Sequence, residues 1–398
     1  MSWECMTGNR WIEIDTDAIR HNYAQLKNVL ADDVRVIAVV KADAYGLGAA
    51  EVSRVLEECG AAMLAVTTAE EGIELRQNGL YLPVLLLSPF LPAEADLILQ
   101  YDLTPSISSL GQVQALEAAG AKGVNVHLKI ETGLGRTGLL PEELPVFLQD
   151  LAECSAVVVD GVFTHFAQAK QGDSFTRKQF ALFQEAIQVL HDFGYNPCFI
   201  HACNSTAALA FPEMHCTAVR VGTLLFGQRP AQTGQGPELR DPFKAKARVV
   251  HIRDVAPGTS IGYGREYLAK KTTWIAVIPL GWADGLTVLP AIRPKNLLDL
   301  LKMAVKLVLD LLGRGRQTEV QIKGKRYHLV GRLGMQLSMA AVDQGVEPGD
   351  EVQFTMRRLS ANPRLPRIYS KAGQVYAVRR ITGAQQNETE YCRDNKYL

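Results

Sequence analysis

The chain has 398 residues, which is enough for one to three domains and for a large buried core. Its 42 lysine and arginine residues balance its 42 aspartate and glutamate residues, which excludes the strong positive charge typical of proteins that bind nucleic acids or acidic membranes. We therefore expect a small molecule as the ligand.

The chain starts with MSWECMTGNRWIEID, which lacks the basic start and the apolar core of a signal peptide. No later window has the roughly 20 apolar residues that a membrane helix needs. The seven cysteines include no C-x-x-C pair, and an odd number in so long a chain argues against a disulfide framework. We expect a cytoplasmic protein with free thiols.

The first predicted βα unit carries a lysine at the end of its strand. Residues 34–40 (VRVIAVV) form the β-branched run typical of a strand that is covered on both faces, and Lys41 follows directly. The stretch AAEVSRVLEECG then predicts a helix that ends at Gly60. Because α/β folds place their chemistry at the carboxyl ends of the strands, Lys41 is a candidate functional residue.

Further strand candidates alternate with helical patterns as far as about residue 225. They are AAMLAV, PVLLLS, LTPSI, VNVHLKI, AVVVDGVF, PCFIHA and CTAVRVG, separated by helical stretches such as SFTRKQFALFQEAIQVLHDFG. Eight βα units in roughly 200 residues favour an α/β fold with a (β/α)8 TIM-type barrel, although an open doubly wound sheet is not excluded by the count. We assign the barrel to residues 1–242.

From about residue 243 the pattern changes to strands separated by glycine and proline turns. The strand candidates lie in AKARVVHIRDVAPGTSIGYG, TTWIAVIPLGWADG, EVQIKGKRYHLVGR and GDEVQFTM. We predict a β-rich domain over residues 243–385, with which the early strand WIEIDTDAI could pair instead of with the barrel. The polar residues 386–398 are predicted to form a frayed tail.

The second domain carries a leucine-rich insert at residues 291–316. Its charged residues Asp299, Lys302, Lys306 and Asp310 recur at spacings of 3, 4 and 4, which leaves most of a helix surface apolar. Such a helix must bury a broad apolar area, in the core, in a dimer interface or as a lid over a substrate entrance.

One glycine motif suggests a nicotinamide dehydrogenase. Gly133, Gly135 and Gly138 in GLGRTG match the dinucleotide fingerprint, and Asp160 ends the next strand about twenty residues later. The fingerprint should open a helix directly, however, whereas the helical pattern here begins only at Pro141. The motif also comes fifth in the alternation rather than first, so we consider the dehydrogenase hypothesis unlikely.

The stretch KADAYG, which begins at Lys41, resembles the cofactor-lysine motif of the alanine racemase family. The resemblance continues through KIETGLGR (129–136), FTHFA (163–167), HACNS (201–205), RVGTLLFG (220–227), GYGR (262–265), IPLGWADG (278–285) and GRLGMQ (331–336). It implies a barrel that uses pyridoxal 5′-phosphate, a C-terminal β domain, and a head-to-tail homodimer whose subunits share the active site. The implied activity is racemisation of an amino acid, with alanine as the first candidate and serine or a larger amino acid as alternatives.

The resemblance implies two catalytic residues on opposite faces of the substrate. Lys41 is the lysine that holds the cofactor and acts as one base, and Tyr263, delivered from the partner subunit, is the other. Two groups are needed because a single base would return the proton to the side from which it came. Taken alone, Lys41 fits a strand-end amine that reaches solvent and Tyr263 fits a turn residue, but the set of motifs favours the catalytic interpretation.

Other residues receive their roles from the same resemblance. Arg220 faces the pyridine nitrogen and leaves it unprotonated, because a guanidinium keeps its own proton. His165 links Arg220 to Tyr263, although it also fits a core histidine at a strand end. The positions around the cofactor phosphate are Tyr45, Asn204, Ser205, Gly222 and Thr223.

The substrate carboxylate is expected to meet Arg136 and the backbone N–H of Met335. Lys129 lies beside Arg136 in the family, and two neighbouring cations repel each other. Family members commonly carbamylate this lysine, which turns it into an anion that orients the arginine. Nothing in the sequence indicates a metal site.

Four positions depart from the family pattern. Gln336 stands where the family usually has aspartate, and Gly334 where it has cysteine. Trp282 and Pro363 each replace a tyrosine of the substrate entrance, so we expect an entrance of different width with fewer hydroxyl groups. These changes leave alanine specificity open, and they motivate a second hypothesis, a non-catalytic or specialised cofactor-binding relative.

Overall fold

The computed structural model describes residues 7–170, 172–230, 236–288, 294, 296–311, 318–382 and 386–391. Contacts between Cα atoms divide the chain into two compact units. Residues 16–242 form one, here called the barrel unit, and residues 1–15 with 243–398 form the other, here called the β unit.

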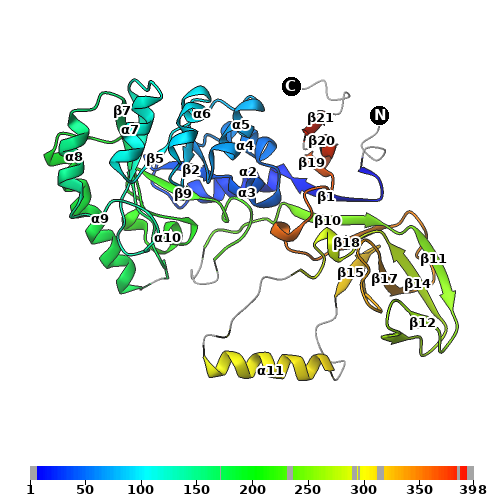
Figure 1. The fold of residues 1–398 in the computed structure, drawn as a ribbon. Coiled ribbons are helices and arrows are strands. Elements are labelled where there is room, and N and C mark those ends of the chain that lie inside the picture. Colours follow the sequence, from blue (N-terminus) through cyan, green and yellow to red (C-terminus); the bar gives the residue numbers. More distant parts are fainter. Residues whose placement is uncertain are drawn as a thin grey trace. The chain divides into compact units, whose positions relative to one another are not determined.

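Eight parallel strands form the inside of the barrel unit, which confirms the predicted (β/α)8 barrel (Figure 1). They pair in two groups, in the orders β4-β3-β2-β9 and β5-β6-β7-β8. Backbone hydrogen bonds join the groups at both edges: the Leu86 N–H donates to the Thr104 carbonyl (2.9 Å), and the Thr217 N–H donates to the Ile200 carbonyl (3.1 Å). The strands are β2 (Arg35–Val39), β3 (Met63–Val66), β4 (Val84–Leu86), β5 (Ser106–Ile107), β6 (Val124–Lys129), β7 (Val157–Phe163), β8 (Phe199–His201) and β9 (Ala218–Val221).

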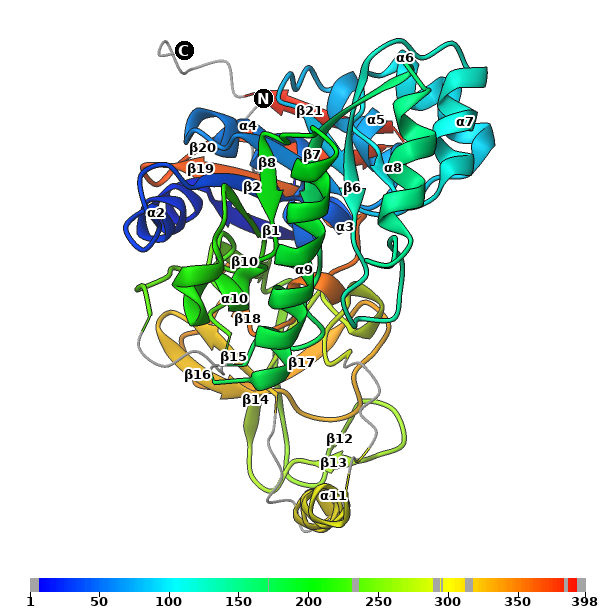
Figure 2. The ribbon, with the colours of Figure 1, turned by 90° about the vertical axis from the view of Figure 1, so that its left-hand side faces the viewer.

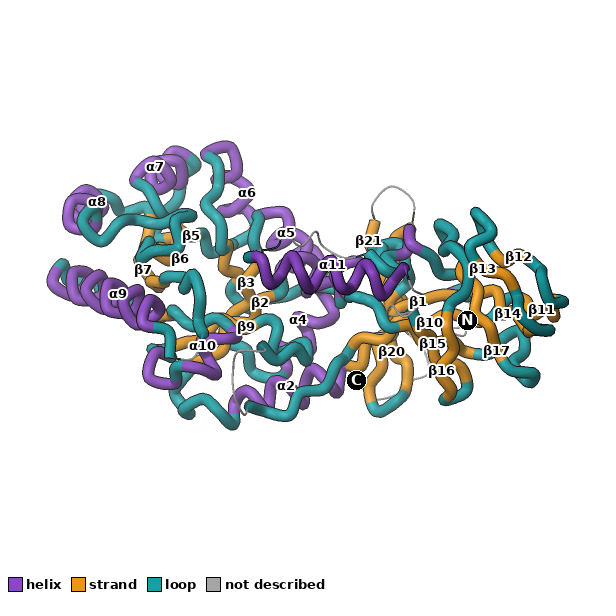
Figure 3. The backbone as a smooth tube through the Cα atoms, turned by 90° about the horizontal axis from the view of Figure 1, so that it is seen from below, coloured by secondary structure: helices purple, strands orange, loops and turns teal. Residues whose placement is uncertain are grey.

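Helices connect these strands, and Figures 2 and 3 show α7, α8 and α9 on the outer side of β6 and β7. The amphipathic sequence of α9 explains its position, because Phe183, Ala186 and Leu190 are buried at helical spacing. The helices are α2 (Thr16–Lys27), α4 (Ala49–Glu58), α5 (Ala69–Gln77), α6 (Ala95–Gln100), α7 (Leu110–Ala118), α8 (Leu144–Ala152), α9 (Ser174–Asp192) and α10 (Ser205–Ala210), with short 3-10 turns η1 (Pro92–Glu94) and η2 (Pro212–Met214). The six residues Lys41–Gly46, labelled α3, form an unusual turn that belongs to the site below.

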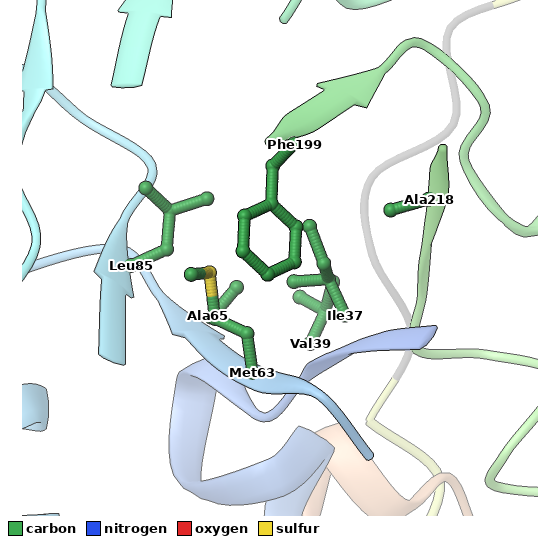
Figure 4. Packing of buried hydrophobic residues seen from close by; sticks show 7 residues of the cluster. All are labelled: Ile37, Val39, Met63, Ala65, Leu85, Phe199 and Ala218. Atoms are coloured by element: carbon green, nitrogen blue, oxygen red, sulfur yellow. The ribbon is translucent and has the colours of Figure 1, made fainter. Parts of the chain in front are cut away.

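A cluster of buried apolar side chains fills the barrel beneath the strand ends (Figure 4). Tyr45, a residue expected at the cofactor phosphate, packs against this cluster. Burying apolar surface stabilises the fold by about 25 cal/mol per Å², so packing of this cluster holds the strands below the site in place. Its members are Ile37, Val39, Met63, Ala65, Leu85, Phe199 and Ala218.

The β unit contains two main sheets, in the orders β16-β15-β18-β10-β1-β19-β20-β21 and β11-β14-β17. A small β12-β13 hairpin and the 3-10 turns η3 (Trp282–Asp284) and η4 (Arg358–Ser360) complete it. The strands are β1 (Arg10–Asp15), β10 (Phe243–Arg248), β11 (His251–Val255), β12 (Ser260–Ile261), β13 (Tyr267–Leu268), β14 (Thr273–Ile278), β15 (Glu319–Ile322), β16 (Lys325–His328), β17 (Ser338–Val342), β18 (Glu351–Phe354), β19 (Arg367–Lys371), β20 (Gln374–Thr382) and β21 (Gln386–Tyr391).

The structure decides the alternative left open for the early strand and corrects the assignment of the tail. Strand β1 pairs antiparallel with β10 and parallel with β19, so it belongs to the β unit and not to a barrel of residues 1–242. The prediction of a frayed tail is wrong for residues 386–391, which form β21 and pair with β20. Backbone pairing explains this result, because ladder hydrogen bonds do not require apolar side chains. Residues 392–398 lie outside the described residues.

The insert at 291–316 is described in part and contains helix α11 (Leu297–Leu311). The prediction that this helix packs into the core is not met, because the apolar side chains that are described, at residues 297–308, are exposed. The dimer-contact and lid hypotheses stay predictions. Among the described residues, no helix is long and apolar enough to cross a membrane. The exposed side chains of α11 are Leu297, Leu298, Leu300, Leu301, Met303, Val305, Leu307 and Val308.

Exposed leucines should contribute little to stability. We expect Leu301→Ala and Leu307→Ala to change the free energy of unfolding by less than about 0.5 kcal/mol, because these side chains are 60% and 68% exposed. The matched control in the same unit is Leu280→Ala, which removes a fully buried side chain and should cost about 2–5 kcal/mol. Urea unfolding measures both. A loss at Leu301 or Leu307 as large as that at Leu280 would mean that α11 is buried in solution.

Candidate active site

A cavity of about 370 Å³ opens at the carboxyl ends of the barrel strands. This edge is where barrels of this type carry their active sites. The cavity brings together all ten barrel residues that were predicted for the site. They are Lys41, Tyr45, Lys129, Arg136, His165, Asn204, Ser205, Arg220, Gly222 and Thr223.

A left-handed turn follows Lys41 and sets the directions of its neighbours. The residues from Ala42 to Tyr45 all have φ between 49° and 58°, a conformation that costs L-residues about 1–2 kcal/mol each. Side chains and backbone around the turn hold it: Glu71 accepts the Ala42 N–H (2.6 Å), and the carboxylate of Asp43 accepts the Ala49 N–H (2.8 Å). The turn allows Lys41 and Tyr45 to line the same cavity, and such strain concentrates at functional sites.

Tyr45, Ser205 and Gly222 form a polar cradle on one side of the cavity. The Gly222 N–H donates to Ser205 Oγ (3.1 Å), and Asn204 Oδ1 accepts the N–H groups of Thr206 (3.0 Å) and Ala207. A Cβ at Gly222 would lie 2.6 Å from the hydroxyl oxygen of Tyr45, so only glycine fits there. The cradle therefore places hydroxyl groups and the Gly222 backbone close to the same point of the cavity, an arrangement that suits a phosphate.

The cavity is strongly positive. Lys41, Lys129, Arg136 and Arg220 line it, and none of the described residues in its lining is a carboxylate. Burial and then Arg136 lower the pKa of Lys41. Burial, Arg136 and Arg220 together lower the pKa of Lys129 to about 8. A site of this kind favours an anionic ligand and keeps part of its amines unprotonated near neutral pH.

Arg220 is buried and holds its charge through hydrogen bonds to oxygen and nitrogen acceptors. Its Nη2 donates to the carbonyls of Thr164 (2.6 Å) and Ala202 (3.1 Å) and lies 3.4 Å from Nδ1 of His165. Burial and the nearby Arg220 lower the pKa of His165 to about 3. His165 is therefore neutral, and its Nδ1 can accept a hydrogen bond from Arg220. This is one of the two contacts by which the resemblance links Arg220, through His165, to Tyr263.

The loop after β6 presents Arg136 and explains the glycine motif. Glu131 accepts the N–H groups of Gly133 (2.5 Å) and Arg136 (3.2 Å), which folds the loop around one carboxylate. A Cβ at Gly138 would lie 2.7 Å from the backbone nitrogen of Glu131, so the glycine permits a close approach of two chain segments. Helix α8 begins only at Leu144, well after the motif. The loop is thus not the helix-opening turn of a dinucleotide site.

Sequence reasoning missed residues that do not line the cavity but form hydrogen bonds to the loops and side chains that do. Glu71 and Glu131 hold the loops that carry Lys41 and Arg136, and neither was singled out. His201 was quoted inside HACNS but received no role, although its Nδ1 lies 2.7 Å from Nη1 of Arg220. A histidine at the end of a strand, next to the residues around the phosphate, was the available signal for it.

Tyr263 and Met335 belong to the β unit, so the cavity itself consists of barrel residues. Tyr263 is 72% exposed and forms a β-bridge with Arg332. Met335 is 61% exposed. Both side chains are therefore accessible for contacts beyond their own unit.

Two of the departing positions in the β unit lie in packed loops. The backbone N–H of Trp282 donates to the Gly334 carbonyl (3.2 Å), and a Cβ at Gly281 would lie 2.4 Å from that oxygen, so the two loops are in close contact. The carbonyl of Pro363 accepts a hydrogen bond from the buried Arg367 (2.7 Å). Hydrogen bonds to backbone carbonyls thus hold both loops, from a backbone N–H at Trp282 and from the Arg367 side chain at Pro363.

Two family models match most of the chain. The model described as alanine racemase, N-terminal domain, matches residues 14–230. The model described as alanine racemase, C-terminal domain, matches residues 243–378. Together they span both units.

Individual proteins agree with these models. The alanine racemase of Halothermothrix orenii is 32% identical over 354 residues, which cover 87% of this chain and 87% of that protein. Alanine racemase 1 of Oceanobacillus iheyensis is 38% identical over 282 residues, which cover 69% of this chain and 75% of that protein.

Solved structures show the same likeness. The structure of alanine racemase from Clostridium difficile 630 has a TM-score of 0.82 and 30% sequence identity, covering 94% of this chain and 99% of that one. A structure of alanine racemase from Bacillus anthracis with bound L-Ala-P has a TM-score of 0.78 and 28% identity, covering 93% and 97%.

The cradle makes a prediction about phosphate binding. Gly222→Ala should push Tyr45 out of its position and weaken binding of pyridoxal 5′-phosphate by at least about tenfold, because a contact of 2.6 Å cannot be kept. Equilibrium titration followed by protein fluorescence measures the affinity. The control is Gly111→Ala in α7, where a Cβ would meet nothing within 4 Å and affinity should not change. Equal affinities for both variants would contradict the assignment of the cradle.

Proposed function

Because the chain belongs to the alanine racemase family and is therefore an amino-acid racemase, we propose that alanine is its substrate and that Lys41 and Tyr263 exchange the α-proton. Serine or a larger amino acid is the alternative substrate. The single observation that carries the proposal is the cavity, which holds the predicted lysine among three further cations and beside a polar cradle.

The residues of the cavity fit pyridoxal 5′-phosphate, on which the family generally depends. The cradle of Tyr45, Ser205 and Gly222 suits its phosphate, and Lys41 would hold it covalently. Arg220, fixed by its carbonyl acceptors, would face the ring nitrogen. When bound, the cofactor supplies an electron sink for the negative charge that proton loss leaves on the α-carbon.

Lys41 is suited to take and return a proton on one face of the substrate. Burial and Arg136 lower the pKa of its amine, so the neutral, basic form is more available than in an ordinary lysine. Arg136, exposed at the edge of the cavity, would bind the substrate carboxylate together with the Met335 N–H. That contact would orient the α-hydrogen, since it fixes one end of a small substrate.

Tyr263 is the proposed acid and base on the opposite face. Tyr263 is 72% exposed in the β unit. This exposure supports a contact between its phenol and a barrel outside its own unit. A head-to-tail homodimer would supply Tyr263 of one chain to the barrel of the other. His165, neutral and in contact with Arg220, would then assist the phenol from the barrel side.

Lys129 is the proposed site of carbamylation. Its amine has a pKa of about 8, contacts the Thr137 hydroxyl, and is buried among cations. Reaction with carbon dioxide requires the free amine, which a lowered pKa provides. The product would be an anion between Arg136 and Arg220, and it would relieve the repulsion that lowers the pKa.

Solvent isotope exchange tests the proposed chemistry. In deuterated water the protein should convert L-alanine into D-alanine that carries deuterium at the α-carbon, and borohydride reduction should fix the cofactor on Lys41. Tyr263→Phe should lower racemisation at least about a hundredfold, because one face then lacks its proton donor. The control Tyr267→Phe changes another phenol in the β unit and should leave racemisation unchanged.

A panel that includes serine and larger amino acids separates the alternatives. Faster deuteration of one of them would replace alanine as the substrate. Absence of deuterium from every amino acid, with the cofactor bound, would favour the non-catalytic relative.

Carbamylation predicts a pH-dependent signal. With carbon-13 bicarbonate, a carbamate resonance should grow as the pH rises toward and through about 8, where Lys129 loses its proton. The resonance should vanish in Lys129→Arg and persist in Lys323→Arg, because Asp350 raises the pKa of Lys323 and keeps that amine charged. A spectrum without this resonance would leave Lys129 an ordinary amine.

A further inference from the structure

Two buried histidines extend from Arg220 into the barrel interior. Nη1 of Arg220 donates to Nδ1 of His201 (2.7 Å), and Nε2 of His201 lies 2.9 Å from Nδ1 of His127. Neither histidine has exposed surface, and the ring of His201 stacks on Phe163 with an angle of 3° between the planes. The three linked side chains come from three strands, β6, β8 and β9.

Arg220 and His127, at the two ends of the His201 ring, together determine where each proton lies. Because Arg220 always donates, Nδ1 of His201 must be the acceptor, and the single proton of a neutral His201 must then lie on Nε2. That N–H donates to Nδ1 of His127, whose own proton must therefore lie on Nε2. An added proton on either ring would place two donors face to face. Burial and then Arg220 lower the pKa of His127 to about 3, which agrees with a neutral pair.

The far end of the chain faces a carboxylate. Nε2 of His127 is buried without a hydrogen-bond partner in the described structure, and Oδ2 of Asp160 lies 4.0 Å from it. Asp160 is partly exposed and lies on β7. The two rings thus extend from Arg220 to within 4.0 Å of the carboxylate of Asp160, without a hydrogen bond to it. Arg35, which stacks on Phe199, is a further cation that acts on both rings.

The local structure of β6 and β7 makes room for this arrangement. The pairing shifts by one residue between Val126 and His127, so that His127 lies opposite Gly161 and Asp160 is the extra residue of a β-bulge. A Cβ at Gly161 would lie 2.5 Å from the His127 ring. The backbone of Gly161 has no positive φ, so space for the ring, and not chain conformation, is what requires glycine there.

We propose that His127 is a positioning residue that acts through His201 on Arg220: by accepting the His201 Nε2–H, it fixes the tautomer that leaves Nδ1 of His201 free to hold the guanidinium. The effect on catalysis rests on the proposed function, since Arg220 matters there as the group facing the cofactor ring. Loss of the acceptor would leave the buried Nε2–H of His201 unpaired, and this cost favours the other tautomer or a ring turned away from Arg220.

Three variants test the proposal in the holoenzyme. His127→Leu introduces an apolar side chain of similar size and removes the acceptor. His127→Asn restores an acceptor, because its Oδ1 can occupy the place of Nδ1. Gly161→Ala keeps His127 and displaces its ring by steric contact. Urea unfolding of each variant reports on general damage to the fold.

Nitrogen-15 NMR of labelled histidine reads the tautomers directly. In the unchanged protein, His127 and His201 should both show a protonated Nε2 and an unprotonated Nδ1, with no titration within about two pH units of neutrality. The Leu and Ala variants should lose the single tautomer of His201, and the Asn variant should keep it. A protonated Nδ1 on His201 in the unchanged protein would overturn the proposal.

Kinetics and spectra give the second measurement. For His127→Leu and Gly161→Ala we expect kcat to fall roughly tenfold with little change in KM, and the pH dependence of the bound cofactor's visible absorption to shift. His127→Asn should stay within about twofold of the unchanged protein. Equal losses in the Leu and Asn variants would assign His127 a packing role only. If the unchanged protein racemises nothing, the NMR pattern still decides the proposal about His127, and only the proposed function fails.

Discussion

The whole site depends on burying the positive charge of Arg220 inside the barrel without a carboxylate partner among the described residues that contact it. An isolated buried cation is costly unless every donor finds an acceptor. Here the acceptors are the carbonyls of Thr164, His201 and Ala202 together with imidazole nitrogens. Most of these groups lie where β7 and β8 end. The polar groups at these strand ends therefore replace the hydrogen bonds that water would make to the guanidinium.

This arrangement determines the state of the neighbouring groups. A fixed cation keeps the nearby histidines neutral, and it contributes to the low pKa of Lys129. The same positive field favours a ligand that brings phosphate and carboxylate groups. The left-handed turn after Lys41 adds strain of about 1–2 kcal/mol per residue, which the contacts of Glu71 and Asp43 hold in place. Charge and strain are thus concentrated at one end of a barrel whose other layers are packed with apolar side chains.

The proposed function draws on two kinds of structure. The barrel unit supplies a rigid cavity, and the β unit supplies exposed residues such as Tyr263 and Met335 on loops. A racemase needs groups on both faces of a small substrate, and side chains from one edge of a barrel reach mainly one face. This geometric demand explains why an accessible phenol outside the barrel is a reasonable second base, and why the loops around Trp282 and Pro363 are where specificity would vary.

The sequence by itself determined the eight buried strands, the position of Lys41 at the end of the first, and the change to β structure near residue 243. These features are local, because short stretches of sequence determine the preference for burial and for turns. The same local pattern also ruled against a dinucleotide site at GLGRTG, since the following helix starts too late. The family motifs then named ten cavity residues that the structure brings together.

Only the tertiary structure decided which distant segments meet. It paired β1 with β10 and β19, gave residues 386–391 a strand partner, and left the described leucines of α11 exposed. It also placed His127 opposite Gly161 through a shift in strand register. Strand partners and register depend on contacts between residues far apart in the chain, and a local pattern of apolar residues does not specify them.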